Sequence, residues 1–326
     1  MRVLVTGGGG YVGCHAIREL ADAGHEVIVY DNFCTGDRKL CDGFELIEGD
    51  IADIETLAPA LDRVEAVMHF AASAYVGESV ANPRKYFRNN VESALALMDA
   101  VLASKVRKFV FSSSCAIYGV PQALPITESL PKEPINPYGA TKLFFERVLS
   151  AYSVSHGLGY AALRYFNAAG AHSNGHIGEI HDPETHLIPL ALKAVLRTAP
   201  PLKIFGTDID TPDGTCIRDF VHVSDLGAAH VLALGYLADG GKSLKLNLGT
   251  GKGTSIKELI AAIRRLTGLS VPHEFVPARA GDPPSLYADP SKAKEILGWV
   301  AKRDIDEILV SAWKWQQKLE AAKGSI

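Results

Sequence analysis

Short apolar runs alternate with amphipathic segments along the first half of the chain. Arg2–Thr6 and Val27–Tyr30 are rich in β-branched residues and predict buried strands, and the apolar spacing of Cys14–Ala23 predicts a helix between them. The same criteria predict further strands and one long helix, at Phe44–Ile47, Ala66–Ala72, Lys108–Ser112 and Asn89–Ala103 respectively. Because strands and helices alternate, the pattern predicts an α/β fold with a doubly wound parallel sheet of the Rossmann type.

The pattern changes after Gly170, where a polar segment (171–186) precedes a second group of elements. The predicted elements are a helix at Leu187–Arg197, a strand at Leu202–Gly206, a segment at Ile217–Val223 leading into a helix that ends at Leu237, a strand at Leu244–Gly249, and helices at Ser255–Leu266, from about Ser291, and near Asp306–Lys323. We therefore expect a Rossmann domain at 1–170 and a smaller C-terminal α/β domain at 171–326, from which about 215–250 returns to the first.

A glycine-rich turn joins the first predicted strand to the first predicted helix. Glycines at 7, 10 and 13 let the backbone turn tightly, approach a pyrophosphate and pack the helix against the strand. Asp31 ends the second strand, 18 residues past Gly13, where an acid hydrogen-bonds the adenosine ribose and repels a 2′-phosphate. The unit predicts NAD rather than NADP binding, although Asp31 could also be an ordinary turn acid after a strand.

Three further polar or small-residue segments follow predicted strands: Asp50–Ile51, Phe70–Ala72 and Ser112–Ser114. Ligands of doubly wound sheets bind beyond the carboxyl ends of the strands. We therefore expect these segments to lie on one edge, together with the glycine-rich turn.

Tyr138 and Lys142 are four residues apart at the start of a predicted helix, Tyr138–Gly157. This spacing places both side chains on one helix face, where the ammonium can approach the phenol oxygen. A nearby cation lowers the pKa of a tyrosine toward the range of a useful base. An exposed pair on an amphipathic helix is the alternative, since Tyr-x-x-x-Lys is common.

Composition excludes several classes of protein. The chain has 326 residues, of which 47% are hydrophobic and 21% charged, and its net charge of -4 and pI of about 6.3 do not favour nucleic acid or an anionic membrane surface. Its five cysteines are scattered and favour reduced thiols. Met1–Val5 runs directly into glycines, and no uncharged apolar run reaches the ~18 residues of a membrane span. We expect a cytoplasmic protein.

Four histidines lie in the polar segment: His172, His176, His181 and His186. A metal site is one interpretation, but the spacing is irregular and no predicted helix presents two of them together. A mobile loop over a ligand is favoured, and no metal is expected.

In order, these motifs resemble those of the extended short-chain dehydrogenase/reductase family over essentially the full length. Its general marks are Thr6-Gly7-x-x-Gly10-x-x-Gly13, Ser114 and Tyr138-x-x-x-Lys142. Motifs resembling one branch, the UDP-glucose 4-epimerases, are Val76–Ser79, Asn89–Val91, Phe111–Ser114, Arg164–Asn167, Arg218–Val223 and Pro277–Asp282.

The resemblance implies a role for each matching residue. Catalysis falls to Ser114, Tyr138 and Lys142. The implied NAD-binding residues, mostly in the first domain, are Gly7, Gly10, Tyr11, Val12, Gly13, Asp31, Asn32, Asp50, Ile51, Phe70, Ala71, Ala72, Asn89, Ser112, Tyr138, Lys142 and Tyr165. The implied UDP-sugar-binding residues, mostly in the second domain, are Ser114, Tyr138, Asn167, His186, Leu187, Lys203, Phe205, Arg218, Arg279 and Asp282. Arginines on separate loops can grip a diphosphate through forked hydrogen bonds.

The implied reaction interconverts UDP-glucose and UDP-galactose. Tyr138 takes the proton of the sugar 4-hydroxyl while NAD accepts a hydride from C4, and Ser114 hydrogen-bonds the same oxygen. The 4-keto sugar turns, and hydride returns to its other face. The resemblance also implies a homodimer built on the helices Asn89–Ala103 and Tyr138–Gly157, with Leu143, Phe144, Val148 and Leu149 as core or interface residues.

Two departures from the family pattern keep alternatives open. Ala74 stands where relatives often carry lysine, and Leu286 where many bacterial relatives carry tyrosine, which leaves the limit on sugar size undecided. Epimerisation of a UDP-N-acetylhexosamine or a UDP-uronic acid is therefore an alternative, and a non-catalytic NAD-dependent sensor is another. Dehydratase chemistry is disfavoured, because Cys115–Ala116 follows Ser114 where those enzymes typically place an acid.

Overall fold

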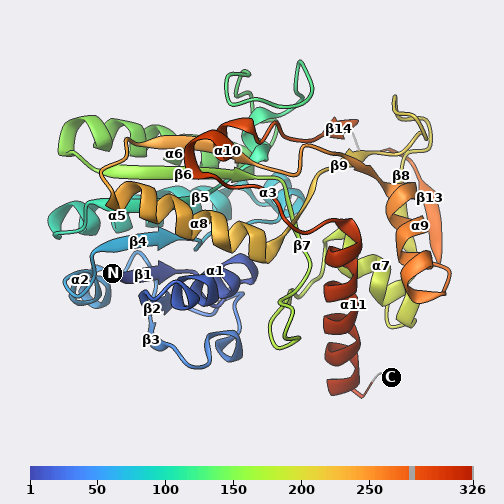
Figure 1. Cartoon of the computed structure of the whole chain (residues 1–326), viewed down its shortest axis with the longest axis horizontal. Coiled ribbons are helices and arrows are strands. Elements are labelled where there is room, and N and C mark those ends of the chain that lie inside the picture. Colours follow the sequence, from blue (N-terminus) through green and yellow to red (C-terminus); the bar gives the residue numbers. More distant parts are fainter. Residues whose placement is uncertain (279–282, 325–326) are drawn as a thin grey trace.

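A seven-stranded parallel sheet forms the centre of the molecule (Figure 1) in the computed structural model, which describes residues 1–278 and 283–324. Its strands are β1 (Arg2–Thr6), β2 (Glu26–Asp31), β3 (Glu45–Glu48), β4 (Ala66–His69), β5 (Lys108–Ser114), β6 (Gly159–Tyr165) and β11 (Leu244–Leu248). The strand order is β11-β6-β5-β4-β1-β2-β3, and every neighbouring pair is parallel. The order reverses between β1 and β4, as in doubly wound folds, and the predicted fold class is confirmed.

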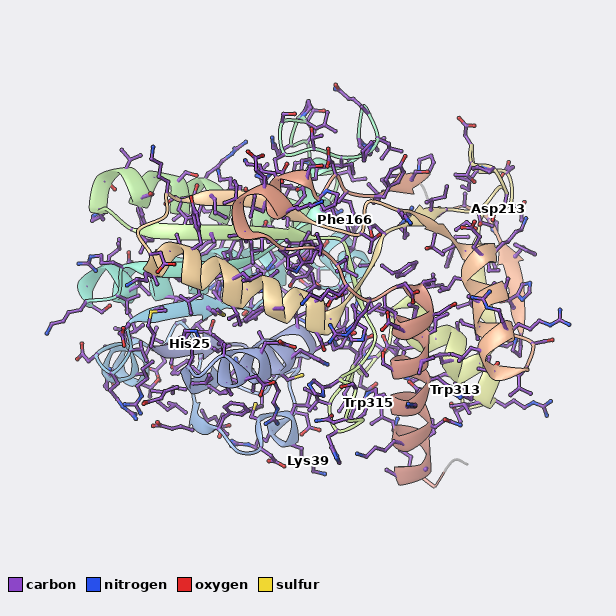
Figure 2. The ribbon with its side chains drawn as sticks, viewed as in Figure 1. His25, Lys39, Phe166, Asp213, Trp313 and Trp315 are labelled. Atoms are coloured by element: carbon purple, nitrogen blue, oxygen red, sulfur yellow. The ribbon has the colours of Figure 1, made fainter. Side chains whose placement is uncertain are left out.

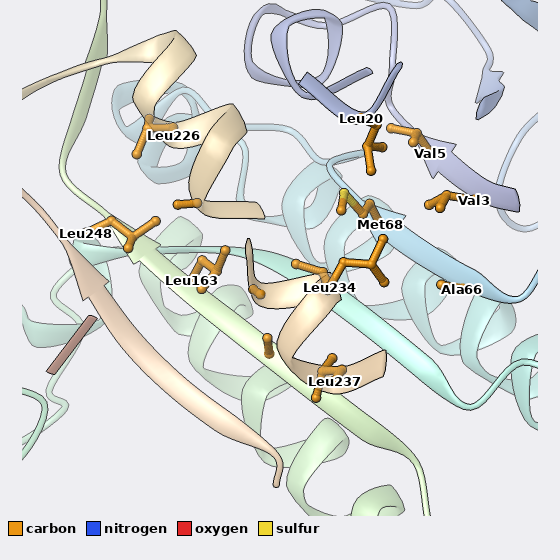
Figure 3. Packing of buried hydrophobic residues seen from close by; sticks show 14 of the residues in the cluster. Val3, Val5, Leu20, Ala66, Met68, Leu163, Leu226, Leu234, Leu237 and Leu248 are labelled. Carbon is orange, nitrogen blue, oxygen red and sulfur yellow. The ribbon is translucent and has the colours of Figure 1, made fainter. Parts of the chain in front are cut away.

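Helices cover both faces of this sheet. One face is packed by α1 (Tyr11–Asp22), α8 (Val223–Ala238) and α10 (Ser291–Leu297), and the other by α2 (Ile54–Leu61), α5 (Ala94–Ala103) and α6 (Pro137–His156). Val3 and Val5 of β1 join the first apolar cluster, together with Leu234 of α8 (Figure 3), whereas Leu4 joins the second. Side chains of a strand alternate between its two faces. Because both faces are buried, the centre of β1, Val3–Val5, is apolar without interruption.

A second group of elements lies beside the sheet (Figure 1). Its members are α7 (Leu187–Leu196), α9 (Ile256–Thr267), α11 (Ile305–Ala322), β8 (Leu202–Phe205) and β13 (His273–Val276), which bury an apolar cluster of their own. Ser255 and Glu258 form the capping box that starts α9. Trp313 and Trp315 both lie on α11 (Figure 2). Trp313 packs against this cluster, whereas Trp315 donates a hydrogen bond to the Glu179 carbonyl.

Short elements connect the two groups. β7 (Asn167–Ala169) pairs with β10 (Phe220–His222), and β9 (Ile217–Arg218) lies between β12 (Thr254–Ser255) and β14 (Ser285–Leu286). The other short elements are η1 (Arg38–Cys41), α3 (Val76–Ala81), α4 (Pro83–Phe87), the π-helical turn η2 (Arg88–Ser93) and η3 (Cys115–Tyr118). Among the described residues, no helix has the length and hydropathy needed to cross a membrane.

Several predicted boundaries were wrong, each for a local reason. β4 ends at His69 rather than at residue 72, because the N–H groups of Phe70 and Ala71 both donate to the Thr6 carbonyl and leave the ladder. β5 continues to Ser114, because its last serines pair with the end of β6. The predicted helix at 89–103 divides into η2 and α5.

Candidate active site

The glycine-rich turn between β1 and α1 fits a ligand that approaches the backbone closely. Gly7 has φ +75°, and a Cβ on it would lie 2.4 Å from the Ala71 nitrogen. A Cβ on Gly13 would lie 2.1 Å from the Gly7 carbonyl oxygen, so the helix start requires glycine there. α1 begins at Tyr11, directly after Gly10, and its first amide groups therefore face the turn.

Tyr11 and Val12 form the first turn of α1. The Tyr11 hydroxyl donates to the Gly170 carbonyl at 2.6 Å, which ties this turn to the start of the 171–186 segment. Val12 is half-buried.

The ends of β2 and β3 bring the predicted adenosine-binding residues together. One carboxylate oxygen of Asp31 accepts from Gly9 N and the other from Phe33 N, both at 2.8 Å. Burial raises the Asp31 pKa, and these backbone hydrogen bonds partly oppose the rise. Asn32 donates to the Asp50 carboxylate at 2.9 Å, and Ile51 is buried beside them. Asp31 thus already fixes the glycine-rich turn on which a dinucleotide would lie.

The segment after β4 lies next to η2. The backbone N–H groups of Phe70 and Ala71 donate to the Thr6 carbonyl at the end of β1, and Ala72 follows them in the chain. Asn89 donates to the Ser73 hydroxyl at 3.2 Å. π-helical turns such as η2 frequently occur at functional sites.

The predicted catalytic residues meet at the ends of β5 and β6. Lys142 Nζ donates to the Ser112 carbonyl at 2.8 Å, and the hydroxyls of Ser112 and Tyr165 are 2.5 Å apart. Ser114 ends β5 and hydrogen-bonds Tyr138. The side chains of Ser112, Ser114, Tyr138 and Lys142 are buried, and that of Tyr165 is partly exposed. Burial therefore separates most of this cluster from bulk water.

The electrostatics of Tyr138 differ from the expectation. Burial raises its pKa, the neighbouring Tyr165 adds to the rise, and the hydrogen bond from Ser114 only partly opposes it. Burial also lowers the pKa of Lys142 to about 7. The Lys142 ammonium lies 5.7 Å from the centroid of the Tyr138 ring and is hydrogen-bonded elsewhere. The Tyr138 pKa is therefore raised rather than lowered as predicted, because desolvation is the largest contribution to it.

The predicted sugar-nucleotide residues are spread over the short connecting elements and the second group of elements. Asn167 donates to the Asp219 carbonyl at 3.1 Å, and Arg218 Nη1 donates to the carbonyls of Ile217 and Pro283. Arg218 also lies near Cys115, whose thiol pKa burial raises to about 12 and this arginine lowers in part.

The other predicted residues of this group occupy three places. His186 caps α7, which begins at Leu187. On β8, exposed Lys203 pairs with Glu274 at 3.9 Å, and Phe205 is half-buried at the strand end. Arg279 and Asp282 lie outside the described residues.

A buried ion pair behind the catalytic cluster was missed from the sequence. Arg164 Nε and Nη2 donate to the two carboxylate oxygens of Glu146, at 2.8 and 2.6 Å. The Ser113 hydroxyl donates to the same carboxylate at 2.6 Å. Glu146 lies on α6 eight residues past Tyr138, on the face that also carries Lys142. That spacing was a usable signal.

The departures from the family pattern occupy different environments. Ala74 is exposed in the segment before α3. Leu286, on β14, packs with Cys115 and Phe166 in a small apolar cluster beside the end of β5 (Figure 2 labels Phe166). A side chain at position 286 therefore lies in the same cluster as Cys115, the residue that follows Ser114.

Comparison with known proteins gives the same assignment along nearly the whole chain. Residues 3–249 match the NAD dependent epimerase/dehydratase family. The UDP-glucose 4-epimerase of Azospirillum brasilense is 48% identical over 99% of this chain and 94% of that protein. The solved UDP-glucose 4-epimerase of Brucella ovis, in complex with NAD, has a TM-score of 0.94 at 51% identity, covering 96% of this chain and 97% of that one. That of Bifidobacterium longum, in complex with NAD+ and UDP, has a TM-score of 0.92 at 37% identity, covering 98% of both chains. The resemblance seen in the motifs is confirmed.

Proposed function

Because the chain belongs to the NAD dependent epimerase/dehydratase family, we propose that it is a UDP-glucose 4-epimerase, an isomerase that interconverts UDP-glucose and UDP-galactose. One observation carries the proposal: the buried side chains of Ser114, Tyr138 and Lys142 lie close together at the ends of β5 and β6. A protein that only sensed NAD could use Tyr138 and Lys142 to hold the cofactor but would not need Ser114 beside them. Curated and solved relatives with this activity span nearly the whole chain, which supports the choice within the family.

The residues of the first domain fit NAD as a resident cofactor. The backbone at Gly7 and Gly13 has no room for a Cβ, and the start of α1 offers amide groups to a pyrophosphate. Asp31, whose carboxylate is anchored to the turn, would accept from the adenosine ribose and repel a 2′-phosphate. When bound, NAD would supply a positively charged ring that can accept a hydride, the chemistry needed to oxidise and re-reduce the sugar at C4.

Tyr138 is the base for the sugar 4-hydroxyl. Burial raises the Tyr138 pKa and so favours the protonated phenol. Positive charge close to the phenol would lower that pKa, so the Lys142 ammonium and the charged ring of a bound NAD would both favour the phenolate. Ser114, already hydrogen-bonded to Tyr138, would bond the same sugar oxygen and keep it aligned. The proton returns from Tyr138 when the 4-keto sugar has turned.

Residues of both domains hold the uridine diphosphate and leave the sugar free to turn. Asn167 and Arg218 lie on β7 and β9, next to the end of β5, and offer an amide and a guanidinium to that group. Guanidinium groups bind phosphate oxygens through forked, charge-assisted hydrogen bonds. His186 and Leu187 start α7 and Phe205 ends β8, where they would close the pocket around the ligand.

The test is turnover of UDP-galactose to UDP-glucose by the purified protein without added NAD. Tyr138→Phe should lower kcat by ~10²-fold or more while UDP binding persists, because only the proton transfer is lost. Tyr152→Phe is the matched control, since Tyr152 lies on the same helix and its ring packs against His156 instead. Near-wild-type turnover of the Tyr138 variant would refute the assigned base, and an inactive wild-type protein would refute the activity.

A further inference from the structure

Four potential metal ligands converge in the segment between β7 and α7. Glu179, His181, Glu184 and His186 each offer one ligand atom, and these atoms all lie within 4.8 Å of one another. His181 Nδ1 is 2.9 Å from a Glu179 oxygen and 3.9 Å from a Glu184 oxygen. His186 Nδ1 contacts the same Glu179 oxygen and is 3.8 Å from that of Glu184. Tetrahedral Zn²⁺ with bonds of ~2.0–2.2 Å holds its ligand atoms about 3.3–3.6 Å apart, so a small shift completes the geometry.

The donor set selects the class of ion. Imidazole nitrogen and carboxylate oxygen together suit Zn²⁺, whereas Mg²⁺ and Ca²⁺ prefer oxygen ligands alone. Two carboxylates aimed at one point repel each other in a poorly solvated site, and a divalent cation removes that repulsion. Two neutral imidazoles can donate to Glu179, but they lie 3.8–3.9 Å from the Glu184 oxygen, which accepts from the backbone N–H groups of Thr185 and His186 at 2.8 and 2.9 Å.

The cluster is built into the fold rather than scattered on a surface. The side chains of Glu179 and Glu184 are 6% and 5% exposed, whereas that of His186 is 46% exposed and leaves an entry side. Glu184 is oriented by the backbone N–H of His186, which donates to it at 2.9 Å. The ring of His181 packs edge-on against Tyr75, with centroids 5.5 Å apart.

A distant helix fixes the start of the segment. Trp315 of α11 donates to the Glu179 carbonyl at 2.9 Å (Figure 2), and the Trp315 ring leaves no room for a Cβ on Gly178, which would lie 2.5 Å from it. The Glu179 backbone is therefore positioned independently of its side chain. Ligands presented by a backbone that is already fixed need little ordering on binding a metal.

We propose that Glu179, His181, Glu184 and His186 bind one Zn²⁺ ion, which fastens the 171–186 segment to the start of α7. This structural site is independent of the hydride and proton transfers proposed above. It assigns Nδ1 of both histidines to the metal, and it replaces the hydrogen bonds to Glu179 by coordination.

Co²⁺ tests the site directly, because a tetrahedral Co²⁺ complex absorbs strongly in visible light. The full-length protein, with its bound cofactor, is treated with a chelator, titrated with Co²⁺ and then with Zn²⁺ as competitor. One equivalent of Co²⁺ should give the absorption, and Zn²⁺ should abolish it. His181→Gln should weaken Zn²⁺ binding by at least ~10–100-fold, the usual cost of losing even a supporting group. His176→Gln is the matched control, since His176 is exposed in the same segment and outside the cluster.

Glu184→Gln serves as a second variant if His181→Gln fails to fold, because its amide oxygen still accepts from the backbone. Zn²⁺ should also raise the thermal unfolding midpoint of the native protein and of His176→Gln, but not that of Glu184→Gln. Absence of the absorption from the native protein overturns the proposal, and so does equal Zn²⁺ affinity in the cluster variants and the His176 control.

Discussion

Removing the buried charge of Glu146 should destabilise the protein more than any surface charge change. Its side chain is 1% exposed and that of Arg164 is 3% exposed, so neither charge can recover hydration when its partner is lost. Glu146 accepts three hydrogen bonds, two from Arg164 and one from Ser113. Glu146→Gln keeps the shape but leaves the guanidinium buried without a counter-charge, which costs roughly 3–5 kcal/mol. That is a large share of the ~5–15 kcal/mol by which domains are stable.

Replacing both partners with apolar residues separates the worth of the pair from the cost of breaking it. In Glu146→Leu/Arg164→Met no charge is buried alone, and such replacements are often neutral or stabilising. Ser113 would then lack its acceptor, at about 1–3 kcal/mol, while the Tyr118 hydroxyl keeps its hydrogen bond to Asn247. The double variant should thus lose about 1–3 kcal/mol, several kcal/mol less than the sum of the two single changes.

Urea unfolding of the wild-type protein, Glu146→Leu, Arg164→Met and the double variant gives the free energies of unfolding for this cycle, and Glu146→Gln is measured beside them. The matched control is Glu92→Gln, because Glu92 pairs with Arg88 at 3.3 Å but both side chains are more than 60% exposed. An exposed pair of this kind contributes about 0.3–0.5 kcal/mol. Additive single changes, or a Glu146→Gln cost no larger than that of the control, would refute the reasoning from burial.

Four further predictions rest on single residues. Asp31→Ala should narrow the preference for NAD over NADP in a binding titration, and an unchanged ratio would show that Asp31 does not face the ribose. Burial lowers the Lys142 pKa to about 7, so the folded protein binds fewer protons than the unfolded chain between about pH 7 and about pH 10, and its stability rises over that window. Lys142→Met should remove this rise in urea unfolding, and parallel wild-type and variant profiles would contradict it. Phe144 on α6 is 42% exposed, as an interface residue would be in a single chain. Light scattering at micromolar concentration should give the mass of a dimer, and Phe144→Glu should weaken that dimer. A monomeric wild-type mass would refute it. Leu286 leaves more space than a tyrosine would, so UDP-N-acetylglucosamine should be a weaker second substrate. Leu286→Tyr should lower kcat/KM for this substrate by ~10–200-fold. If the native protein does not turn it over, Leu286 is not the residue that limits sugar size.

The fold was predictable where burial on both faces leaves a continuous apolar run. β1 was placed at its observed bounds, because every one of its side chains faces a helix layer or the strand end. β5 was placed two residues short, since Ser113 and Ser114 are polar and do not look like strand residues. They are strand residues because Arg164 and Tyr165 pair with them, a partnership between segments about 50 residues apart. Local patterns carry no information about such a partner.

The candidate site divides in the same way between local and distant causes. Tyr138, Lys142 and Glu146 follow the helical period, so one helix face brings them together whatever the rest of the fold does. The pKa of Tyr138 could not be predicted, because it depends on how completely β5 and β6 bury it. The metal cluster could not be predicted either, since its spacing (179, 181, 184, 186) follows neither the period of a strand nor that of a helix. Its geometry is set by Tyr75 and Trp315, from segments about 100 and 130 residues away. A histidine-rich loop therefore becomes a ligand set only through what the rest of the chain packs around it.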